Sequence, residues 1–451
     1  MALFETTNPA TGATIKTYQH TSLQEAEKTL QALQDDFLKW RKIDFSERSQ
    51  SLQLLAEALR FYKDELAQLM NSEMGKSLAE GKAEVEKCAV TCEYYALEGA
   101  NMLKNIEVSL SPYPQCEISF QPLGIVFSIM PWNFPLWQVI RFAAPTLMAG
   151  NLILLKHADL VTGTAEKIAS IFANLKTPVP LLRLAQVTHE DSARLIANPL
   201  VKAVTFTGST EGGRVVAQEA AKNLKKIVLE LGGSDPYIIL ADANLENAAK
   251  LCAKARLGNA GQSCVAAKRF IPVAEVSKRF LDLLKAEMES VELAPLAHSR
   301  FQKKIIEQVE KLKSLGGKVV LGGVAPEGNS AFYPPTILYF EKNHPEIHHE
   351  EVFGPVAMVI RAETPEQAMN IANASPFGLG GGVFSENVDA AKQWVEKELE
   401  SGFVVVNDFV RSDARIPFGG VKNSGYGREL SQFGIHEFVN IKTVASAGGK
   451  V

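Results

Sequence analysis

Short apolar segments alternate with helix-like segments in two successive series, and this alternation constrains the fold more than any other feature of the sequence. The first series comprises residues 125–130, 152–156, 203–207 and 227–231. The second series comprises residues 237–240, 318–321, 356–360, 382–384 and 403–406. Strands that alternate with helices are typical of parallel sheets covered by helices on both faces. The sequence therefore predicts an α/β protein that contains two such domains.

The rest of the chain contains a helical region and two isolated extended segments. Residues 22–104 include long stretches of Leu, Ala, Glu and Lys without proline, and we expect several packed helices there. The extended segments span residues 116–121 and 438–445. A strand without a neighbour exposes unpaired backbone groups and often pairs with another subunit. This pattern predicts a contact with another subunit through these two segments.

Composition excludes several classes of function. The 451 residues carry a net charge of −4, so no overall positive charge attracts nucleic acid or an acidic membrane surface. The five cysteines are scattered, and the first residues lack the basic and apolar regions of a signal peptide. The longest apolar stretch, residues 123–140, is interrupted by prolines and polar side chains, unlike a membrane span. We expect a cytoplasmic protein without nucleic-acid or membrane partners.

Two segments contain candidate catalytic side chains. Cys264 ends a glycine-rich segment, residues 258–264, whose backbone amides could activate a thiol and hold an oxyanion. The alternative is a buried structural thiol. Glu230 ends an apolar strand just before two glycines, where burial would raise its pKa as a general base requires. The alternative is an ordinary solvated acid at a strand end.

Two turns are candidate binding elements. A strand runs through Gly208 and Ser209 into a helix, and the free amides of a helix N-terminus favour a phosphate. Without a Walker or GxGxxG pattern, a plain strand-to-helix turn is an equal alternative. The prolines of residues 131–135 define a turn that presents Trp132 and Asn133. The Asn133 amide could donate to an oxyanion or could cap backbone groups.

These elements together resemble the NAD(P)-dependent aldehyde dehydrogenase superfamily, and the resemblance covers nearly the whole chain. The matching motifs lie in order at residues 8–12, 131–135, 154–156, 206–210, 229–233, 261–264, 351–355 and 417–425. The resemblance implies the aldehyde dehydrogenase fold, with a Rossmann-like cofactor domain over 1–230 that includes an oligomerisation segment near 108–122. It also implies an α/β catalytic domain over 231–420 and a C-terminal return with an oligomerisation strand over 421–451. Members of the family form dimers and tetramers, so the resemblance implies an oligomerisation arm and a homodimer or homotetramer.

The resemblance also implies a mechanism. Cys264 would attack the aldehyde, and Asn133 with the Cys264 amide would hold the oxyanion of the thiohemiacetal. After hydride leaves for the nicotinamide, Glu230 would activate the water that hydrolyses the thioester to a carboxylic acid.

The cofactor residues follow from the same resemblance. Lys156 and Glu351 would bind ribose hydroxyls, Phe353 would lie beside the nicotinamide ribose, and Trp132, Gly208 and Ser209 would lie near the pyrophosphate. Asp159 lies three residues after Lys156, where many NAD-preferring members carry Glu. A carboxylate there accepts from a ribose 2′-hydroxyl and repels a 2′-phosphate, which predicts NAD over NADP with partial discrimination.

For the substrate, the chain is most similar to bacterial succinate-semialdehyde dehydrogenases. In that subgroup an arginine and a serine bind the far carboxylate, and Arg141 and Ser412 occupy these positions. A second arginine of some members is replaced by Gly258, so Arg415 is an alternative. The predicted reaction is oxidation of succinic semialdehyde to succinate. Another semialdehyde or a medium-chain aldehyde remains an alternative substrate.

Other classes of function are less compatible with the sequence. A thiol hydrolase would not need Lys156, Ser209 and Glu351, and a non-catalytic relative would be expected to lose Cys264 or Glu230. The histidines at 344, 348 and 349 suggest a metal site, but Pro345 disfavours the helix that would align them, so we treat them as surface residues. Cys88 and Cys92 are expected in the core, and no metal site is expected.

Overall fold

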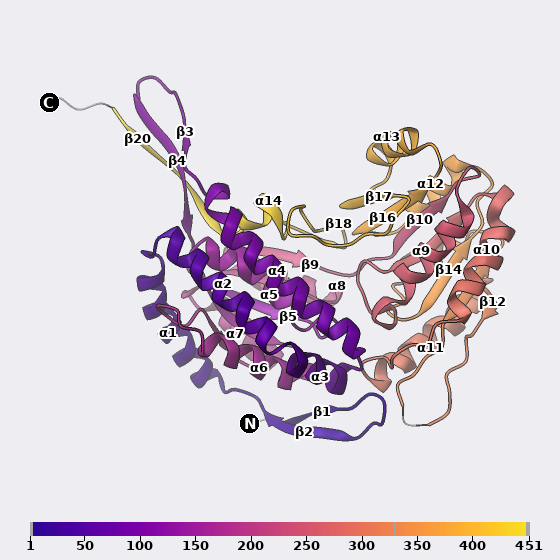
Figure 1. Cartoon of the computed structure of the whole chain (residues 1–451), viewed down its shortest axis with the longest axis horizontal. Coiled ribbons are helices and arrows are strands. Elements are labelled where there is room, and N and C mark those ends of the chain that lie inside the picture. The colour runs from indigo at the N-terminus through magenta and orange to yellow at the C-terminus, as the bar shows by residue number, and fades with distance from the viewer. Residues whose placement is uncertain (1–2, 329, 448–451) are drawn as a thin grey trace.

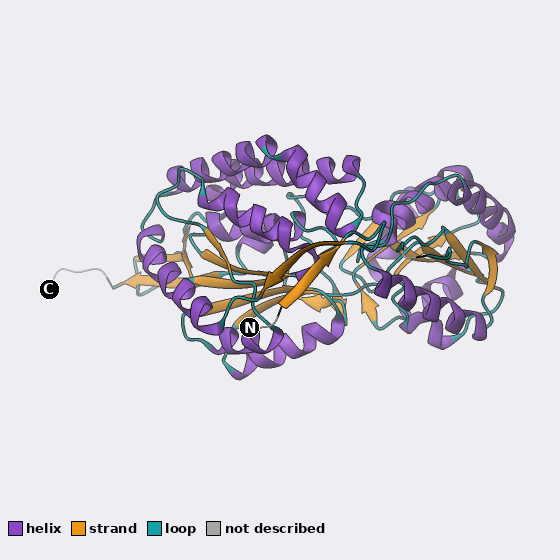
Figure 2. Cartoon of the chain, turned by 90° about the horizontal axis from the view of Figure 1, so that it is seen from below, coloured by secondary structure: helices purple, strands orange, loops and turns teal. Residues whose placement is uncertain are grey.

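A computed structural model describes residues 3–328 and 330–447 of the protein. Two helix-covered β-sheets form two lobes, and a small third sheet projects from one end (Figure 1). Seen at right angles, helices lie on both faces of the strands in each lobe (Figure 2). The prediction of two α/β units is therefore confirmed.

The first sheet has the strand order β19-β9-β8-β5-β6-β7. Its strands are β5 (Ile125–Met130), β6 (Leu152–His157), β7 (Leu182–Leu184), β8 (Val201–Thr207), β9 (Lys226–Glu230) and β19 (Gly425–Tyr426). All pairs are parallel except β19 with β9. Burial on both faces explains why these strands are continuous apolar runs in the sequence. The carboxyl ends of these strands form the edge where ligands bind in such sheets.

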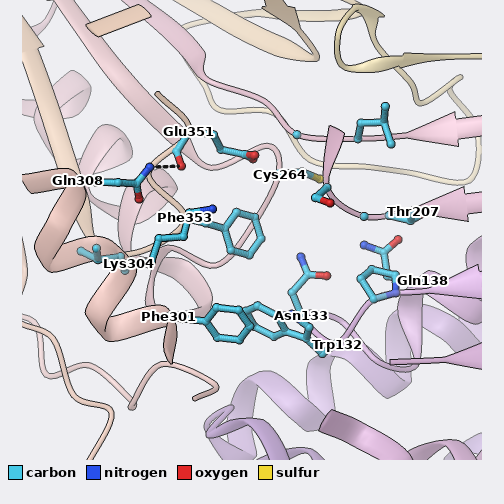
Figure 3. A pocket seen from close by; sticks show the side chains of 16 residues that line it. Trp132, Asn133, Gln138, Thr207, Cys264, Phe301, Lys304, Gln308, Glu351 and Phe353 are labelled. Atoms are coloured by element: carbon cyan, nitrogen blue, oxygen red, sulfur yellow. Dashed lines mark hydrogen bonds between the residues drawn. The ribbon is translucent and has the colours of Figure 1, made fainter. Parts of the chain in front are cut away.

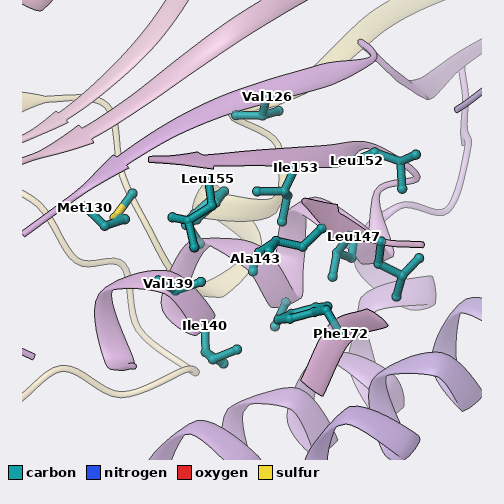
Figure 4. Packing of buried hydrophobic residues seen from close by; sticks show 14 of the residues in the cluster. Val126, Met130, Val139, Ile140, Ala143, Leu147, Leu152, Ile153, Leu155 and Phe172 are labelled. Atoms are coloured by element: carbon teal, nitrogen blue, oxygen red, sulfur yellow. The ribbon is translucent and has the colours of Figure 1, made fainter. Parts of the chain in front are cut away.

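The expected N-terminal helices cover this sheet together with helices that follow its strands. They are α1 (Leu23–Trp40), α2 (Phe45–Phe61), α3 (Lys63–Met74), α4 (Leu78–Met102), α5 (Trp137–Met148), α6 (Thr162–Ala173), α7 (His189–Ala197) and α8 (Thr210–Lys222). Helix α5 is buried along its whole length, and its Val139, Ala143 and Leu147 pack toward β6 (Figure 4). A fully buried valine or leucine side chain contributes roughly 1.5–3 kcal/mol to folding. Helix α5 is thus a rigid base for the turn that precedes it.

The second sheet has the order β12-β13-β14-β11-β10-β16-β17 and is parallel except for β12 with β13. Its strands are β10 (Asp235–Ile239), β11 (Ala267–Pro272), β12 (Lys318–Leu321), β13 (Thr336–Phe340), β14 (Val356–Ile360), β16 (Gly380–Phe384) and β17 (Phe403–Val406). The helices of this lobe are α9 (Leu245–Leu257), α10 (Ala274–Glu289), α11 (Ser299–Ser314), α12 (Pro365–Asn373) and α13 (Val388–Glu398). The sequence analysis missed β11, because its Lys268 and Arg269 disguise a strand that is buried at every position.

The third sheet corrects one expectation. Its strands β3 (Ile106–Glu107), β4 (Gln115–Pro122) and β20 (Val439–Ser446) have the order β20-β4-β3. The two extended segments were expected to find partners in another subunit, but β4 and β20 pair with each other, from Val439 opposite Pro122 to Ser446 opposite Gln115. Backbone groups over eight residue pairs are therefore satisfied within one chain.

The remaining elements connect these layers. They are the hairpin β1 (Leu3–Thr7) and β2 (Thr14–Gln19), the pair β15 (Phe377–Gly378) and β18 (Val421–Lys422), helix α14 (Ser431–Ile435), and the 3₁₀ turns η1 (Asp159–Val161), η2 (Gly258–Gly261) and η3 (Pro345–His349). The chain passes from the first sheet to the second between Glu230 and Asp235, and returns to the first sheet as β19. Within the described ranges, no helix has the length and apolar character needed to cross a membrane.

Candidate active site

Cys264 lies in a tightly wound loop between α9 and β11. Asn259 and Ala260 adopt left-handed conformations with φ of 53° and 52°. Gly261 also has a positive φ, and a Cβ there would lie 2.4 Å from the backbone of Gly354, so only glycine fits. The Lys268 ammonium donates to the Cys264 carbonyl oxygen at 2.8 Å. These constraints hold the half-buried thiol at a point where two cavities meet.

The Cys264 thiol is not activated in this state. Burial raises the pKa of Cys264 to about 12, and the positive charges of Arg141 and Lys268 offset only part of that rise. The glycine-rich loop could activate the thiol through its backbone amides, and desolvation acts in the opposite direction. Because the thiolate is the nucleophile, a base or a bound ligand must favour the loss of the proton.

Asn133 is tied directly to the cysteine loop. Its side-chain Nδ2 donates to the Gln262 backbone carbonyl oxygen at 3.1 Å. Its backbone carbonyl oxygen accepts from Asn259 Nδ2 at 2.9 Å. Lys76 Nζ donates to the same Asn133 carbonyl at 3.0 Å. The turn at residues 131–135 and the loop at 258–264 are therefore one hydrogen-bonded unit. This unit places the Asn133 side-chain amide in a cavity that Cys264 also lines.

Helix α4 supports this unit with buried charges that the sequence analysis did not identify. Glu84 accepts from the backbone amides of Leu136 and Trp137, each at 2.9 Å, where α5 begins. Its other carboxylate oxygen pairs with Lys76, and both side chains are buried. A carboxylate at a helix N-terminus is favourable because it satisfies free amides and opposes the helix dipole. No local motif marks this pair, since its role depends on a segment about fifty residues away.

Glu230 ends β9 as predicted, but it lines neither cavity. The side chain is only 2% exposed, and within the described ranges neither carboxylate oxygen has a hydrogen-bond partner. Burial raises the pKa of Glu230 well above its usual range, and the nearby carboxylate of Glu429 raises it further. Its neighbours Leu231 and Gly232 line the cavity described next. Burial in this conformation therefore favours the protonated form of Glu230.

The first cavity gathers most of the predicted cofactor residues around Cys264. Trp132 stacks on Phe301 with ring centroids 4.6 Å apart and meets the edge of Phe353 at 5.8 Å (Figure 3). The cavity is also lined by Asn133, Gln138, Thr207, Gly208, Ser209, Lys304, Gln308 and Glu351. Glu351 accepts from the Gly233 amide at 3.0 Å, which holds its carboxylate beside the strand connection.

The groups that line this cavity suit a dinucleotide. Ser209 caps α8 by accepting from the Gly212 amide at 3.1 Å, so the N-terminus of a helix opens onto the cavity where a phosphate is favourable. A Cβ at Gly232 would lie 2.2 Å from Glu351 Oε2, so glycine allows the carboxylate to lie against the backbone. Such a cofactor needs a helix terminus for its phosphates, a carboxylate for its ribose hydroxyls and aromatic side chains beside its rings.

Lys156 and Asp159 lie in a separate cluster at the carboxyl end of β6 and do not line the first cavity. Lys156 Nζ donates to the His157 carbonyl oxygen at 3.0 Å and lies 3.6 Å from Asp159 Oδ1. Asp159 also accepts from Gln186 Nε2 at 2.7 Å and lies 3.3 Å from His20 Nε2. The carboxylate is thus held in place but remains 39% exposed.

The second cavity opens on the other side of Cys264. Its polar side chains come from α4, from α5, from the cysteine loop and from the segment that follows β17. Its apolar walls include Phe134, Trp137, Phe409 and Phe418. Both predicted substrate residues line it. Arg141 is paired with the buried carboxylate of Glu429 and lies 4.7 Å from the Phe418 ring centroid. The Ser412 hydroxyl accepts from Lys87 Nζ at 2.7 Å. The sequence analysis did not identify Lys87.

The histidine group at residues 344–349 has a structural role. His344 caps the 3₁₀ turn η3 by accepting from the Glu346 amide. His348 is 1% exposed, so the expectation that all three are surface residues is wrong for this one. It lies within hydrogen-bond distance of Arg269 and of Asn343. Cys88 and Cys92 are core residues, as expected, and all five cysteines are free thiols.

Comparison with known proteins agrees with this architecture. The sequence profile described as "Aldehyde dehydrogenase family" matches residues 2–444. The chain is 40% identical to an NAD(P)+ succinate semialdehyde dehydrogenase of Escherichia coli, covering 97% of this chain and 96% of the relative. It is 38% identical to an NADP+ succinate-semialdehyde dehydrogenase of Mycobacterium leprae, covering 97% and 98%. The crystal structure of a succinic semialdehyde dehydrogenase from Streptococcus pyogenes with NADP+ superimposes with a TM-score of 0.95 at 33% identity, covering 98% and 99%.

Proposed function

The chain belongs to the aldehyde dehydrogenase family, and we propose that it oxidises succinic semialdehyde to succinate with a nicotinamide dinucleotide as hydride acceptor. The observation that carries this proposal is the position of Cys264 at the junction of two cavities. One cavity has the helix terminus, carboxylate and aromatic walls that a dinucleotide needs. The other has apolar walls and cationic side chains suited to an aldehyde that ends in a carboxylate.

In the proposed reaction, Cys264 Sγ attacks the aldehyde carbon and forms a thiohemiacetal. The Asn133 side-chain amide and the Cys264 backbone amide donate to the oxyanion. When bound in the first cavity, the nicotinamide dinucleotide accepts the hydride. We assign its binding to Trp132, Gly208, Ser209, Glu351 and Phe353 around the cavity, with Lys156 toward the adenine ribose. Residues 1–230 would then supply most of the cofactor site and residues 231–420 the nucleophile.

Glu230 is the proposed general base for hydrolysis of the thioester. Its carboxyl group must lose a proton and rotate toward Cys264, because in the resting conformation it is buried without a partner. Raised pKa values are typical of carboxylates that act as bases near neutral pH. Displacement toward the cavity would also bring the carboxylate nearer to water and away from Glu429, which lowers the cost of its charge.

Asp159 supports a preference for NAD over NADP. A carboxylate at the end of β6 accepts from a ribose 2′-hydroxyl and repels a 2′-phosphate. His20 and Lys156, which flank Asp159, weaken that repulsion, so we propose that NADP is a second, poorer substrate. The names of the E. coli and M. leprae relatives include NADP+, which supports use of both forms.

We also propose that the protein is a homo-oligomer assembled through the third sheet and that it resides in the cytoplasm. Ile441 and Val444 of β20 are 62% and 46% exposed, so the projecting strand presents two apolar side chains that another subunit could cover. Light scattering on Ile441→Asp tests the arm, with Leu224→Asp, at an apolar site that is 94% exposed and far from β20 in sequence, as the control. Only the first substitution should reduce the mass of the particle.

The proposed cytoplasmic location agrees with the cysteines. All five are free thiols, which suits a reducing compartment.

The test of the proposed reaction is the rate of nicotinamide reduction with three aldehydes and two cofactors. The aldehydes are succinic semialdehyde, glutaric semialdehyde and butanal, each measured with NAD and with NADP. The expected result is the highest kcat/KM for succinic semialdehyde with NAD. Preference for butanal would retain the chemistry and refute the proposed substrate, and no reduction with any pair would refute the reaction.

A further inference from the structure

The charged side chains that line the second cavity differ in whether they already have partners. Glu80 accepts from the Ser77 hydroxyl at 2.8 Å and from the Asn259 amide at 2.7 Å. Glu84 is occupied by Lys76 and by two backbone amides at the start of α5. Arg411 pairs with Asp408 outside the cavity. Each of these side chains already has a hydrogen-bond or ion-pair partner within the protein.

Arg141, which the resemblance assigns to the substrate, is only partly neutralised within the protein. Its guanidinium pairs with Glu429, and each side chain is only 2% exposed. Within the described ranges, its buried Nη2 has no hydrogen-bond partner. A substrate carboxylate that approached Arg141 would also meet the field of Glu429 behind it. Glu429 therefore weakens the attraction of Arg141 for a ligand carboxylate without removing it.

Lys87 is the exception among the charged residues that line the cavity. Within the described ranges, no carboxylate lies within 4.0 Å of its ammonium group. The ammonium donates to Ser412 at 2.7 Å and lies 4.0 Å from the Trp137 ring centroid. An ammonium has three donors, so this arrangement leaves at least one for a ligand. Burial lowers the pKa of Lys87 to about 8, which reflects a cation without a counter-ion.

We propose that Lys87, with Ser412 beside it, supplies a second cationic contact to the carboxylate of the substrate, in addition to Arg141. This inference rests on the proposed function, because it requires an aldehyde that carries a carboxylate. Lys87 and Cys264 line the same cavity, so one extended ligand can meet the thiol at one end and the ammonium at the other. The apolar walls between them suit its methylene groups.

Three variants test the proposal. Lys87→Met removes the charge and keeps the length of the side chain, and Lys87→Arg restores a cation. Lys82→Met, on the same helix, is the matched control, because Lys82 is half exposed, pairs with Asp64 and does not line the cavity. Each variant is assayed with succinic semialdehyde and with butanal, which has the same number of carbon atoms and no carboxylate. Inhibition by succinate gives a second readout of carboxylate binding.

We expect Lys87→Met to lower kcat/KM for succinic semialdehyde by about 10- to 100-fold, the range for loss of one charge-assisted hydrogen bond. The loss should be mainly in KM, inhibition by succinate should weaken in parallel, and kcat/KM for butanal should change by less than about threefold. Lys87→Arg should recover part of the loss, and Lys82→Met should behave as the wild type.

The outcomes separate the two hypotheses. If the wild type prefers succinic semialdehyde and Lys87→Met keeps that preference, the inference is refuted and the proposed function survives. An equal loss with both aldehydes would give Lys87 a structural role and also refute the inference. If the wild type does not prefer the carboxylate, the proposed substrate is refuted, and the role of Lys87 is refuted with it.

Discussion

The two cavities that meet at Cys264 are built in different ways. The first is lined mostly by turns and strand ends whose residues form recognisable motifs, such as 131–135, 208–209 and 351–353. The second is lined by faces of α4 and α5 and by the segment after β17. Its central contact, between Lys87 and Ser412, joins residues 325 positions apart. Local backbone geometry therefore creates the first cavity, and long-range packing creates the second.

The two cavities also differ in the partners of their charged side chains. In the first, Glu351 accepts from a backbone amide and the helix terminus offers its dipole. In the second, most ionised side chains are neutralised in pairs, which leaves Lys87 as the cation without a carboxylate partner in the described structure. We infer that the first cavity recognises features shared by dinucleotides, and that the second discriminates between aldehydes.

The largest expected effect concerns the residue that both cavities share. Replacing Cys264 by serine removes the nucleophile, and we expect kcat to fall by on the order of 10³-fold or more with every aldehyde. Nicotinamide reduction followed by absorbance measures it. Quenching of Trp fluorescence by NAD should persist, because Trp132 and its neighbours are unchanged. Residual turnover near the wild-type level would mean that the two cavities do not share a nucleophile.

Glu230→Gln should separate the two halves of the reaction. Without the base, hydrolysis of the thioester slows, and we expect kcat to fall by about 10²- to 10⁴-fold. A stopped-flow burst of reduced nicotinamide close to one per site should remain, since acylation needs Cys264 and the cofactor. In the wild type, kcat should rise with pH, because burial raises the pKa of Glu230 and a higher pH removes the proton that the general base must lose. Loss of the burst would show that Glu230 acts before deacylation.

The pH dependence of substrate preference sharpens the difference between the cavities. Burial lowers the pKa of Lys87 to about 8, and the positive charge of Arg141 lowers it further. Cys88, Glu84 and Asp413 act in the opposite direction and raise this pKa. Raising the pH from 7 to 9 should neutralise the ammonium and increase KM for succinic semialdehyde by roughly tenfold. The KM for butanal serves as the internal control and should stay nearly constant. A parallel rise for both aldehydes would point to a group outside the second cavity.

The smallest effect is expected on the cofactor side. Asp159→Ala removes the carboxylate that opposes a 2′-phosphate, and because Asp159 is 39% exposed the repulsion is screened by solvent. We expect the ratio of kcat/KM for NADP to that for NAD to rise by about three- to tenfold. The ratio for succinic semialdehyde to butanal should not change. A changed aldehyde preference would show that the two cavities are coupled.

Much of this architecture is predictable from short segments. The strands of the first sheet are apolar because they are buried on both faces, so β5, β6, β8 and β9 match the predicted segments closely. Strand β11 is different, because its buried Arg269 donates to the carbonyl oxygens of Ile371 and Ala372 from a distant part of the chain. A local pattern contains no information about such partners.

The sequence by itself determined most strands of the first sheet, the positions of Cys264 and of the acid at the end of β9, and the turns around the first cavity. Each of these is a local property, since backbone preference and the burial pattern of a strand act over a few residues. Only the tertiary structure decided that Arg141 pairs with Glu429, that β4 pairs with β20, and that Lys87 donates to Ser412. The reason is physical: the availability of a charge depends on every group that folding brings within a few ångströms, from any part of the chain.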